Sequence, residues 1–176
     1  MLILPLLFAC QSKLFTIEIS EKAKTTVEAG TLLEDLLGDL GFDDFVTMDV
    51  TEAEELKNQG VEPGDIQEVT LTSFTLTATA PDGADLSFLD EMSVAVSAPD
   101  LDEVRIAHAD DFPEGEPKVS FTLDDVDLTA YVVSQSLTIT TDVTAHRPEQ
   151  DTDVTAAFTL DVGVTAQGVK NQAGSR

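Results

Sequence analysis

The stretch Val154-Thr155-Ala156-Ala157-Phe158-Thr159-Leu160-Asp161-Val162-Gly163-Val164 decides the fold of this chain. Every even-numbered position holds an apolar residue, whereas Thr155, Thr159 and Asp161 stand at odd-numbered positions. A period of two puts these two sets on opposite faces of a β-strand, while a helix would repeat at about 3.6 residues. The stretch therefore predicts a strand with one face in a hydrophobic core.

The same alternation recurs through most of the chain, and turn residues separate the runs. Pro81-Asp82-Gly83 is one such turn and Pro99-Asp100 is another. Near Ser73 the apolar residues change parity, which indicates a bulge within one long strand. The other alternating runs are residues 14–20, 69–80, 92–98, 104–108, 119–123 and 137–143. About seven or eight strands predict an antiparallel β-sandwich; a barrel is the alternative, but the uneven strand lengths favour the sandwich.

Residues 21–66 are expected to form a helical insert. Thr31 with Glu34, and Thr51 with Glu54, have the spacing of a capping box at the start of a helix. The first pair precedes leucines at helical spacing, which are Leu32, Leu33, Leu36, Leu37 and Leu40. These patterns predict two short helices packed at one end of the sandwich.

The chain contains a weak internal repeat: Asp85-Leu86-Ser87 and Asp127-Leu128-Thr129 have similar sequences, and each lies between two predicted strands. A duplicated hairpin with a one-turn helical crossover would explain this repeat. Local capping by aspartate, arising twice by chance, would explain it equally well.

The composition is typical of a globular protein and is strongly acidic. The chain of 176 residues carries 34 Asp and Glu against nine Lys and Arg, a formal charge of −25, with a hydrophobic fraction of 42%. One domain of this length buries a core without disulfides or metals. A surface of this charge repels phosphate backbones, so nucleic acid is not expected as a partner. A solvated acidic surface is favoured over a calcium-binding one.

The start of the chain has the order of features found at a lipid-attachment site. Residues 1–9 are apolar but too short to span a bilayer, which takes about 20 residues. The single cysteine follows in Leu7-Phe8-Ala9-Cys10, which resembles the lipobox of bacterial lipoproteins. The resemblance implies cleavage after Ala9, acylation of Cys10 and, with Gln11 rather than Asp next in the chain, an outer-membrane destination.

The expected organisation is a truncated signal peptide at 1–9, a lipidated Cys10 with a tether to residue 13, a single domain over 14–166 and a polar tail over 167–176. The middle of the chain, including residues 55–60 and 136–141, resembles acidic bacterial lipoproteins of uncharacterised activity. This second resemblance carries no site residues.

Motifs for catalysis are absent from the sequence: it has no Gly-x-Ser-x-Gly, no His-Glu-x-x-His and no glycine-rich phosphate loop. His108 and His146 lack partners at metal-ligand spacing and are interpreted as strand-edge or loop residues. The acidic turns could provide oxygen ligands for calcium, although none of these turns has the spacing of an EF-hand loop. Its candidate ligands are Asp82, Asp85, Asp110, Asp111, Asp124, Asp125 and Asp127.

Three functions therefore stand as hypotheses. The first is an envelope lipoprotein, anchored in the membrane through Cys10, that works as a non-catalytic binding or structural module with an envelope or surface protein as partner. The second is a carrier of an apolar ligand, with the leucine-rich helices closing a pocket between the sheets. The third, which is the least favoured, is an envelope hydrolase, which needs a cleft where histidine and carboxylates converge.

Overall fold

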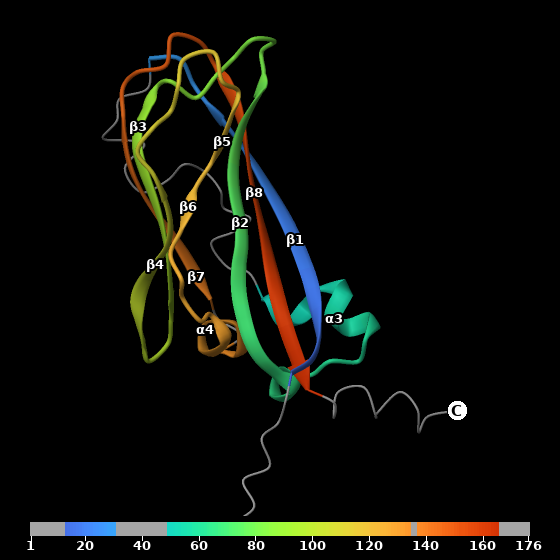
Figure 1. The fold of residues 1–176 in the computed structure, drawn as a ribbon. Coiled ribbons are helices and arrows are strands. Elements are labelled where there is room, and N and C mark those ends of the chain that lie inside the picture. Colours follow the sequence, from blue (N-terminus) through green and yellow to red (C-terminus); the bar gives the residue numbers. More distant parts are fainter. Residues whose placement is uncertain (1–12, 31–48, 135–136, 166–176) are drawn as a thin grey trace, which may run out of the picture.

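The computed structural model describes residues 13–30, 49–134 and 137–165. Two four-stranded antiparallel sheets lie face to face and enclose the core (Figure 1). The predicted β-sandwich is confirmed.

Both sheets join strands that are distant in sequence. The first sheet has the order β1 (Lys13–Val27), β8 (Thr152–Thr165), β2 (Ile66–Ala80) and β5 (Lys118–Ser120). The second sheet has the order β6 (Thr122–Leu123), β4 (Leu101–Ala109), β3 (Leu89–Ala98) and β7 (Thr138–Ala145).

Strand β8, which contains the stretch quoted first, is an inner strand of the first sheet. It pairs with β1 from Thr152 to Thr165 and with β2 on its other side. Its even-numbered side chains from Val154 to Val164 are all buried, as the alternation predicts. Burying each large apolar side chain contributes about 1.5–3 kcal/mol relative to leaving it in water, so this strand supplies much of the core.

The expected bulge in β2 is present. The register of β2 against β8 shifts between Leu71 and Ser73, and the buried positions change parity there. The shift turns Phe74 and Leu76 into the core after Val69 and Leu71 have faced it. The bulge therefore keeps one face of a 15-residue strand apolar despite the parity change.

The helical insert begins later than the sequence predicts. Residues 21–27 belong to β1 and pair with β8 as far as Val27 and Thr152. Ala23 and Val27 face the core, so burial on one face overrides the helix-forming preference of Glu21, Lys22 and Lys24. The helix expected to open at Thr31 lies outside the described residues.

The second predicted helix exists, but its predicted cap is wrong. A 3₁₀ turn, η1 (Val50–Glu52), precedes the helix α3 (Glu54–Asn58), whose N-cap residue Ala53 makes no side-chain hydrogen bond. The carboxylate of Asp49 accepts a hydrogen bond from the Thr51 amide instead, at 3.0 Å. Leu56 of α3 is completely buried, so one side chain attaches this helix to the core.

Two further short helical segments complete the described chain: a 3₁₀ turn, η2 (Pro63–Asp65), and the helix α4 (Thr129–Val133). α4 is held to β2 because the Val69 amide donates to the Thr129 hydroxyl at 3.0 Å and the Leu128 amide donates to the Val69 carbonyl at 2.8 Å. Both α-helices lie at the same end of the sandwich (Figure 1).

The strand register defines two ends of the molecule. At the first, which we name the base, Lys13 of β1 lies opposite Thr165 of β8. At the other, the tip, Val27 lies opposite Thr152. The 15 residues of β1 separate the two ends by roughly 45 Å at about 3.3 Å per residue.

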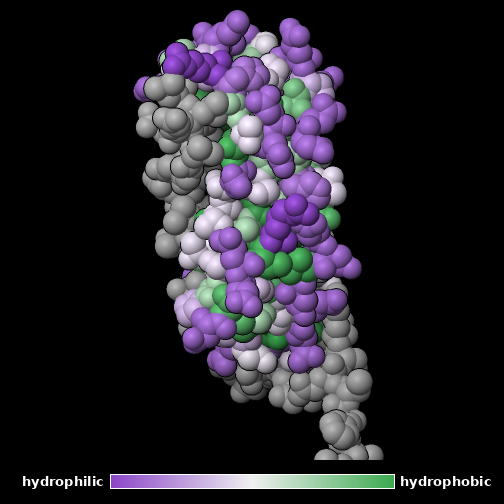
Figure 2. All heavy atoms as spheres, turned by 90° about the vertical axis from the view of Figure 1, so that its left-hand side faces the viewer, coloured by the Kyte–Doolittle hydropathy of each residue, from purple (hydrophilic) through white to green (hydrophobic). Residues whose placement is uncertain are grey.

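Seen from the side of the second sheet, hydrophilic residues cover most of the described surface, and hydrophobic residues show between them in its lower half (Figure 2). Within the described ranges, no helix combines the length and the apolar character needed to cross a bilayer.

Candidate functional site: a cleft at the tip

Three loops meet at the tip and enclose a cleft of about 480 Å³. They are the β2–β3 loop (residues 81–88), the β4–β5 loop (110–117) and the β7–β8 loop (146–151). The residues that line the cleft are Gly83, Asp85, Ser87, Phe88, Glu114, His146, Arg147, Pro148, Glu149, Gln150 and Thr152. Loops carried on a rigid sandwich are the usual place for ligand binding in this architecture.

Asp85 joins two of these loops. Its carboxylate accepts hydrogen bonds from the Ser87 amide at 3.0 Å, the Ser87 hydroxyl at 2.7 Å and the Gly115 amide at 2.6 Å. The Gly115 amide, and then the Ser87 hydroxyl and amide, hold the pKa of Asp85 below its usual value. The carboxylate therefore stays charged at neutral pH and ties the β2–β3 loop to the β4–β5 loop.

Gly115 is suited to its place by backbone geometry. Its φ of +80° lies in the left-handed region that other residues rarely adopt. This conformation turns the Gly115 amide toward Asp85 and completes the contact between the loops.

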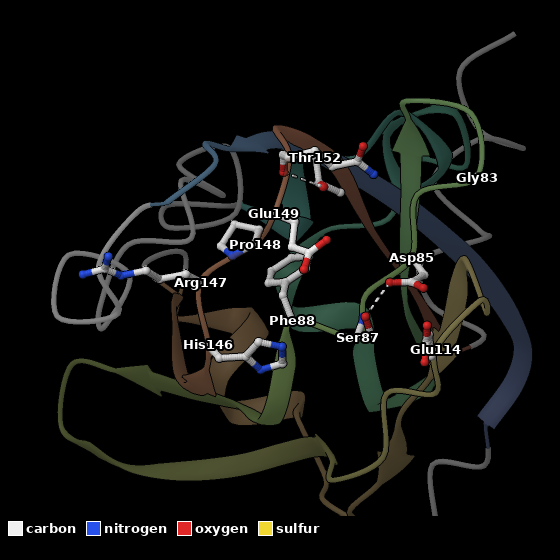
Figure 3. A pocket seen from close by; sticks show the side chains of 11 residues that line it. Gly83, Asp85, Ser87, Phe88, Glu114, His146, Arg147, Pro148, Glu149 and Thr152 are labelled. Atoms are coloured by element: carbon white, nitrogen blue, oxygen red, sulfur yellow. Dashed lines mark hydrogen bonds between the residues drawn. The ribbon is translucent and has the colours of Figure 1, made fainter.

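The third loop is fastened by backbone hydrogen bonds. The His146 amide donates to the Phe88 carbonyl at 2.7 Å, and the Gly30 amide donates to the Pro148 carbonyl at 3.1 Å. The Ala29 amide donates to the Asp151 carboxylate at 2.8 Å. The side chain of Phe88 is buried between the two sides of the cleft, with Asp85 and Glu114 on one side and the residues of the β7–β8 loop on the other (Figure 3). The cleft thus has a fixed apolar floor.

The charges in the cleft are mostly negative. Asp85, Glu114 and Glu149 bring three carboxylates to its lining, against the single guanidinium of Arg147. Figure 3 shows that the Arg147 side chain extends away from the other labelled side chains. The interior consequently offers acceptors for hydrogen bonds and favours a ligand that carries positive charge.

Histidine and carboxylates do meet in this cleft, as a hydrolase would require. The Nδ1 atom of His146 lies 3.5 Å from an oxygen of Asp90, which does not line the cleft. Ser87 is the serine of the cleft lining and would be the candidate nucleophile. Its hydroxyl donates a hydrogen bond to Asp85, and in the described part of the chain no hydrogen bond joins it to His146. A serine nucleophile needs a base at about 2.6–3.2 Å, and this pair does not form one here.

The seven aspartates considered for calcium are spread over three places. Asp82 and Asp85 lie in the β2–β3 loop, and Asp110 and Asp111 border a separate hollow of about 280 Å³ beside β5. Asp124, Asp125 and Asp127 lie between β6 and α4. Within residues 13–30, 49–134 and 137–165, no group of three or more His, Cys, Asp or Glu side chains is arranged to hold a metal ion.

Two of the aspartates in the third group already have partners. The carboxylate of Asp124 accepts from Arg105 at 2.8 and 3.3 Å and lies 3.7 Å from Nδ1 of His108. The hydrogen bond from Arg105 lowers the pKa of Asp124. Asp127 accepts from the Thr129 hydroxyl and amide, which lower its pKa in the same way.

The internal repeat is a local turn formed by an aspartate side chain. In both copies the aspartate carboxylate accepts hydrogen bonds from the amide and hydroxyl of the residue two positions later, Ser87 or Thr129. The first copy connects the two sheets through β2 and β3, whereas the second leads from β6 to β7 within one sheet. Only the second copy opens an α-helix, so the two segments share a turn and no larger unit.

The space between the sheets is small and wholly apolar. It measures about 20 Å³, and the described residues at its walls include Leu71, Phe74, Phe158 and Leu160. This is about the room for one water molecule, so an acyl chain would require the sheets to separate.

Several cleft residues are not among the sequence-derived candidates: Phe88, Glu114, Arg147, Glu149 and Gln150. They come from loops that are brought together only by the strand order. The one sequence signal is the density of Asp, Glu, Pro and Gly in residues 81–88, 110–117 and 146–151. Cys10, the expected lipidation site, lies outside the described residues.

No protein-family model, curated protein or solved structure matches the chain.

Proposed function

We propose that the protein is a membrane-anchored envelope lipoprotein, held through Cys10, that binds a cationic ligand in the tip cleft without catalysing a reaction. The cleft of about 480 Å³, formed by the β2–β3 loop and two loops that are each hydrogen-bonded to it, is the observation that carries this proposal. This cleft has a fixed floor, Phe88, and several charged side chains in its lining.

The position of the cleft fits an anchored binding module. Strand β1 begins with Lys13, three positions after Cys10, and Lys13 lies at the base. An anchor at Cys10 would therefore hold the base near the bilayer and direct the tip away from it. Several acyl chains, each contributing about 0.8 kcal/mol per buried CH₂, give a durable attachment.

The chemistry of the cleft indicates the class of ligand. Glu114 and Glu149 form no ion pair with another residue of the described region, while Arg147 extends outward (Figure 3). Amines and guanidines match such acceptors, and an overall charge of −25 steers cations toward the molecule. A basic peptide segment of an envelope or surface protein has this chemistry.

The anchor is tested by feeding cells an alkyne fatty acid and comparing the wild type with Cys10→Ala. We expect the wild type to be labelled and to sediment with membranes, and the variant to lose both properties. Label and membrane association that persist in the variant would overturn the anchor.

The cleft is tested by titrating the purified protein with tetralysine and measuring heat release. We expect the double variant Glu114→Gln, Glu149→Gln to weaken binding roughly tenfold, which corresponds to about 1.4 kcal/mol. The matched control is Glu54→Gln with Glu55→Gln, an equal change of charge on exposed positions of α3 at the base. Equal weakening in both double variants would show that only net charge matters and would contradict a site at the tip.

A further inference from the structure

The outer face of the first sheet carries a basic patch on this acidic molecule. The register places two rows of side chains across the strands from β1 through β8 and β2 to β5. The row nearer the tip is Lys24, Thr155, Thr77 and Lys118, and the next is Lys22, Ala157, Thr75 and Ser120. We name these eight residues the lysine-framed face.

The alternation of burial shows that these side chains point outward. Their sequence neighbours Ala23, Ala156, Leu76 and Val119 are all buried in the core. Successive side chains of a strand point to opposite faces, so the eight residues share the solvent side of the sheet. The three lysines are exposed.

The charge of this face is opposite to that of the whole chain. Neither row contains a carboxylate, and none of the three lysines forms an ion pair with a described residue. Toward the tip, the next row contains Asp153, which already accepts a hydrogen bond from Thr26 at 2.7 Å. Lys118 also borders the hollow with Asp110 and Asp111, so the patch ends at β5.

Toward the base, the next row is uncharged and hydroxyl-rich. The hydroxyl of Ser20 lies 3.1 Å from that of Thr159, and the hydroxyl of Ser73 lies 3.4 Å from it on the other side. Carboxylates return only one row further, at Glu18 and Asp161. The lysines thus border an area of small hydroxyl and methyl groups on the sheet.

We propose that the lysine-framed face binds an acidic polysaccharide that carries about one carboxylate per sugar. The ammonium groups at the two sheet edges would bind carboxylates, and the hydroxyls of Thr75, Thr77 and Ser120 would exchange hydrogen bonds with sugar hydroxyls. The Thr155 hydroxyl is buried and takes no part in this binding. The rows span three strand spacings, about 14 Å at about 4.8 Å each, which is wide enough for several sugar units.

Other anionic partners fit this face less well. The patch has no aromatic, arginine or large apolar side chain to anchor a folded protein, and lysine is depleted at the centres of protein interfaces. A second copy packed face to face would set lysines against lysines. A polymer of low charge density is repelled least by the remaining surface of a molecule with a charge of −25.

The test measures binding of the purified protein to immobilised polygalacturonate at low ionic strength. We expect Lys22→Gln with Lys24→Gln to weaken binding roughly tenfold. The charge-matched control is Lys57→Gln with Arg105→Gln, since Lys57 pairs with Glu52 on the base helix and Arg105 pairs with Asp124 on the other sheet. The control is expected to change binding less than twofold, and the melting temperature of each variant confirms that it folds.

Two competing polymers separate the alternatives. Methyl-esterified polygalacturonate, which has the same backbone without charge, is expected not to bind. Polyglutamate is expected to bind more weakly than polygalacturonate, and equal or tighter binding would overturn the polysaccharide in favour of an acidic peptide. Absence of binding to polygalacturonate, or an equal loss in both double variants, would also overturn the proposal.

Discussion

At the scale of single residues, Asp85 determines how firmly the loops of the tip are joined. Its three accepted hydrogen bonds come from two loops, and they lower its pKa. The sequence marks Asp85 as a turn aspartate, but its contact with Gly115 spans 30 positions and has no local signal. Asp85 is one of the candidate calcium ligands, and in the structure its carboxylate joins two loops.

The first prediction concerns the pH dependence that Asp85 confers. Because its pKa is lower in the folded protein, its contribution to stability is present above the unfolded value near 3.8 and is lost as pH falls through the folded value. We expect Asp85→Asn to lower the free energy of unfolding by about 1 kcal/mol at pH 7, since the site is partly exposed. Urea unfolding at pH 7 and pH 3 measures this.

The control for Asp85 is Asp82→Asn in the same loop, where the side chain is exposed. The difference between the two variants should shrink at pH 3. A difference that grows toward pH 3 would contradict the assignment of the hydrogen bonds to a charged Asp85.

Gly115 gives a second prediction at this scale. An alanine there has open space for its Cβ but must adopt the φ of +80°. We expect Gly115→Ala to destabilise the protein by about 1–2 kcal/mol through backbone strain alone. The matched substitution is Gly64→Ala, which also meets no atom within 4 Å and has no positive φ. Equal thermal stability of the two variants would be incompatible with this explanation.

At the scale of elements, the alternation of apolar residues predicts the strands correctly, whereas the capping pattern of Thr51 and Glu54 predicts the wrong N-cap. The even-numbered apolar positions of β8 and the parity change near Ser73 both appear as predicted, because burial on one face determines strand register. The sequence predicts that the first strand ends before residue 21, because Glu21, Lys22, Ala23 and Lys24 are good helix formers in isolation. Only the pairing of these residues with β8 makes them a strand.

The helix α3 provides a prediction about elements. Leu56 is its one fully buried side chain, so we expect Leu56→Ala to cost about 2–5 kcal/mol. The neighbouring Glu55→Ala, on an exposed position, should change stability by less than about 0.5 kcal/mol. Chemical denaturation of both variants measures the contrast, and a loss of less than about 1 kcal/mol for Leu56→Ala would show that α3 is not packed as described.

At the scale of the whole molecule, net charge sets the response to salt. A formal charge of −25 implies self-repulsion that counter-ions relieve. We expect the melting temperature to rise as NaCl increases from about 10 mM to about 500 mM, a range over which the screening length falls severalfold. A melting temperature that stays constant would contradict this account of the surface.

Added divalent ions separate screening from a specific site. Since no three acidic or histidine side chains in the described ranges are arranged around a metal, we expect Ca²⁺ and Mg²⁺ at equal ionic strength to stabilise the protein equally. A larger increase in melting temperature with Ca²⁺ would support a calcium site.

The division into base and tip is also a property of the whole molecule. The sequence predicts the strands and their turns, but the cleft depends on which turns share one end. Which turns share one end is determined by pairing between distant residues such as Val27 and Thr152. The alternation of apolar residues does not show which strands pair. The sequence shows that the three loops are rich in acidic and turn-forming residues, but it does not predict that they lie next to one another.

The most direct measurement of the tip-cleft proposal is a chemical-shift map of the isotope-labelled protein titrated with tetralysine. We predict that the shifted amides concentrate in residues 81–88, 110–117 and 146–151, and that they move little in the variant carrying Glu114→Gln and Glu149→Gln. Shifts spread evenly over the acidic surface, or concentrated at the base, would contradict a binding site at the tip.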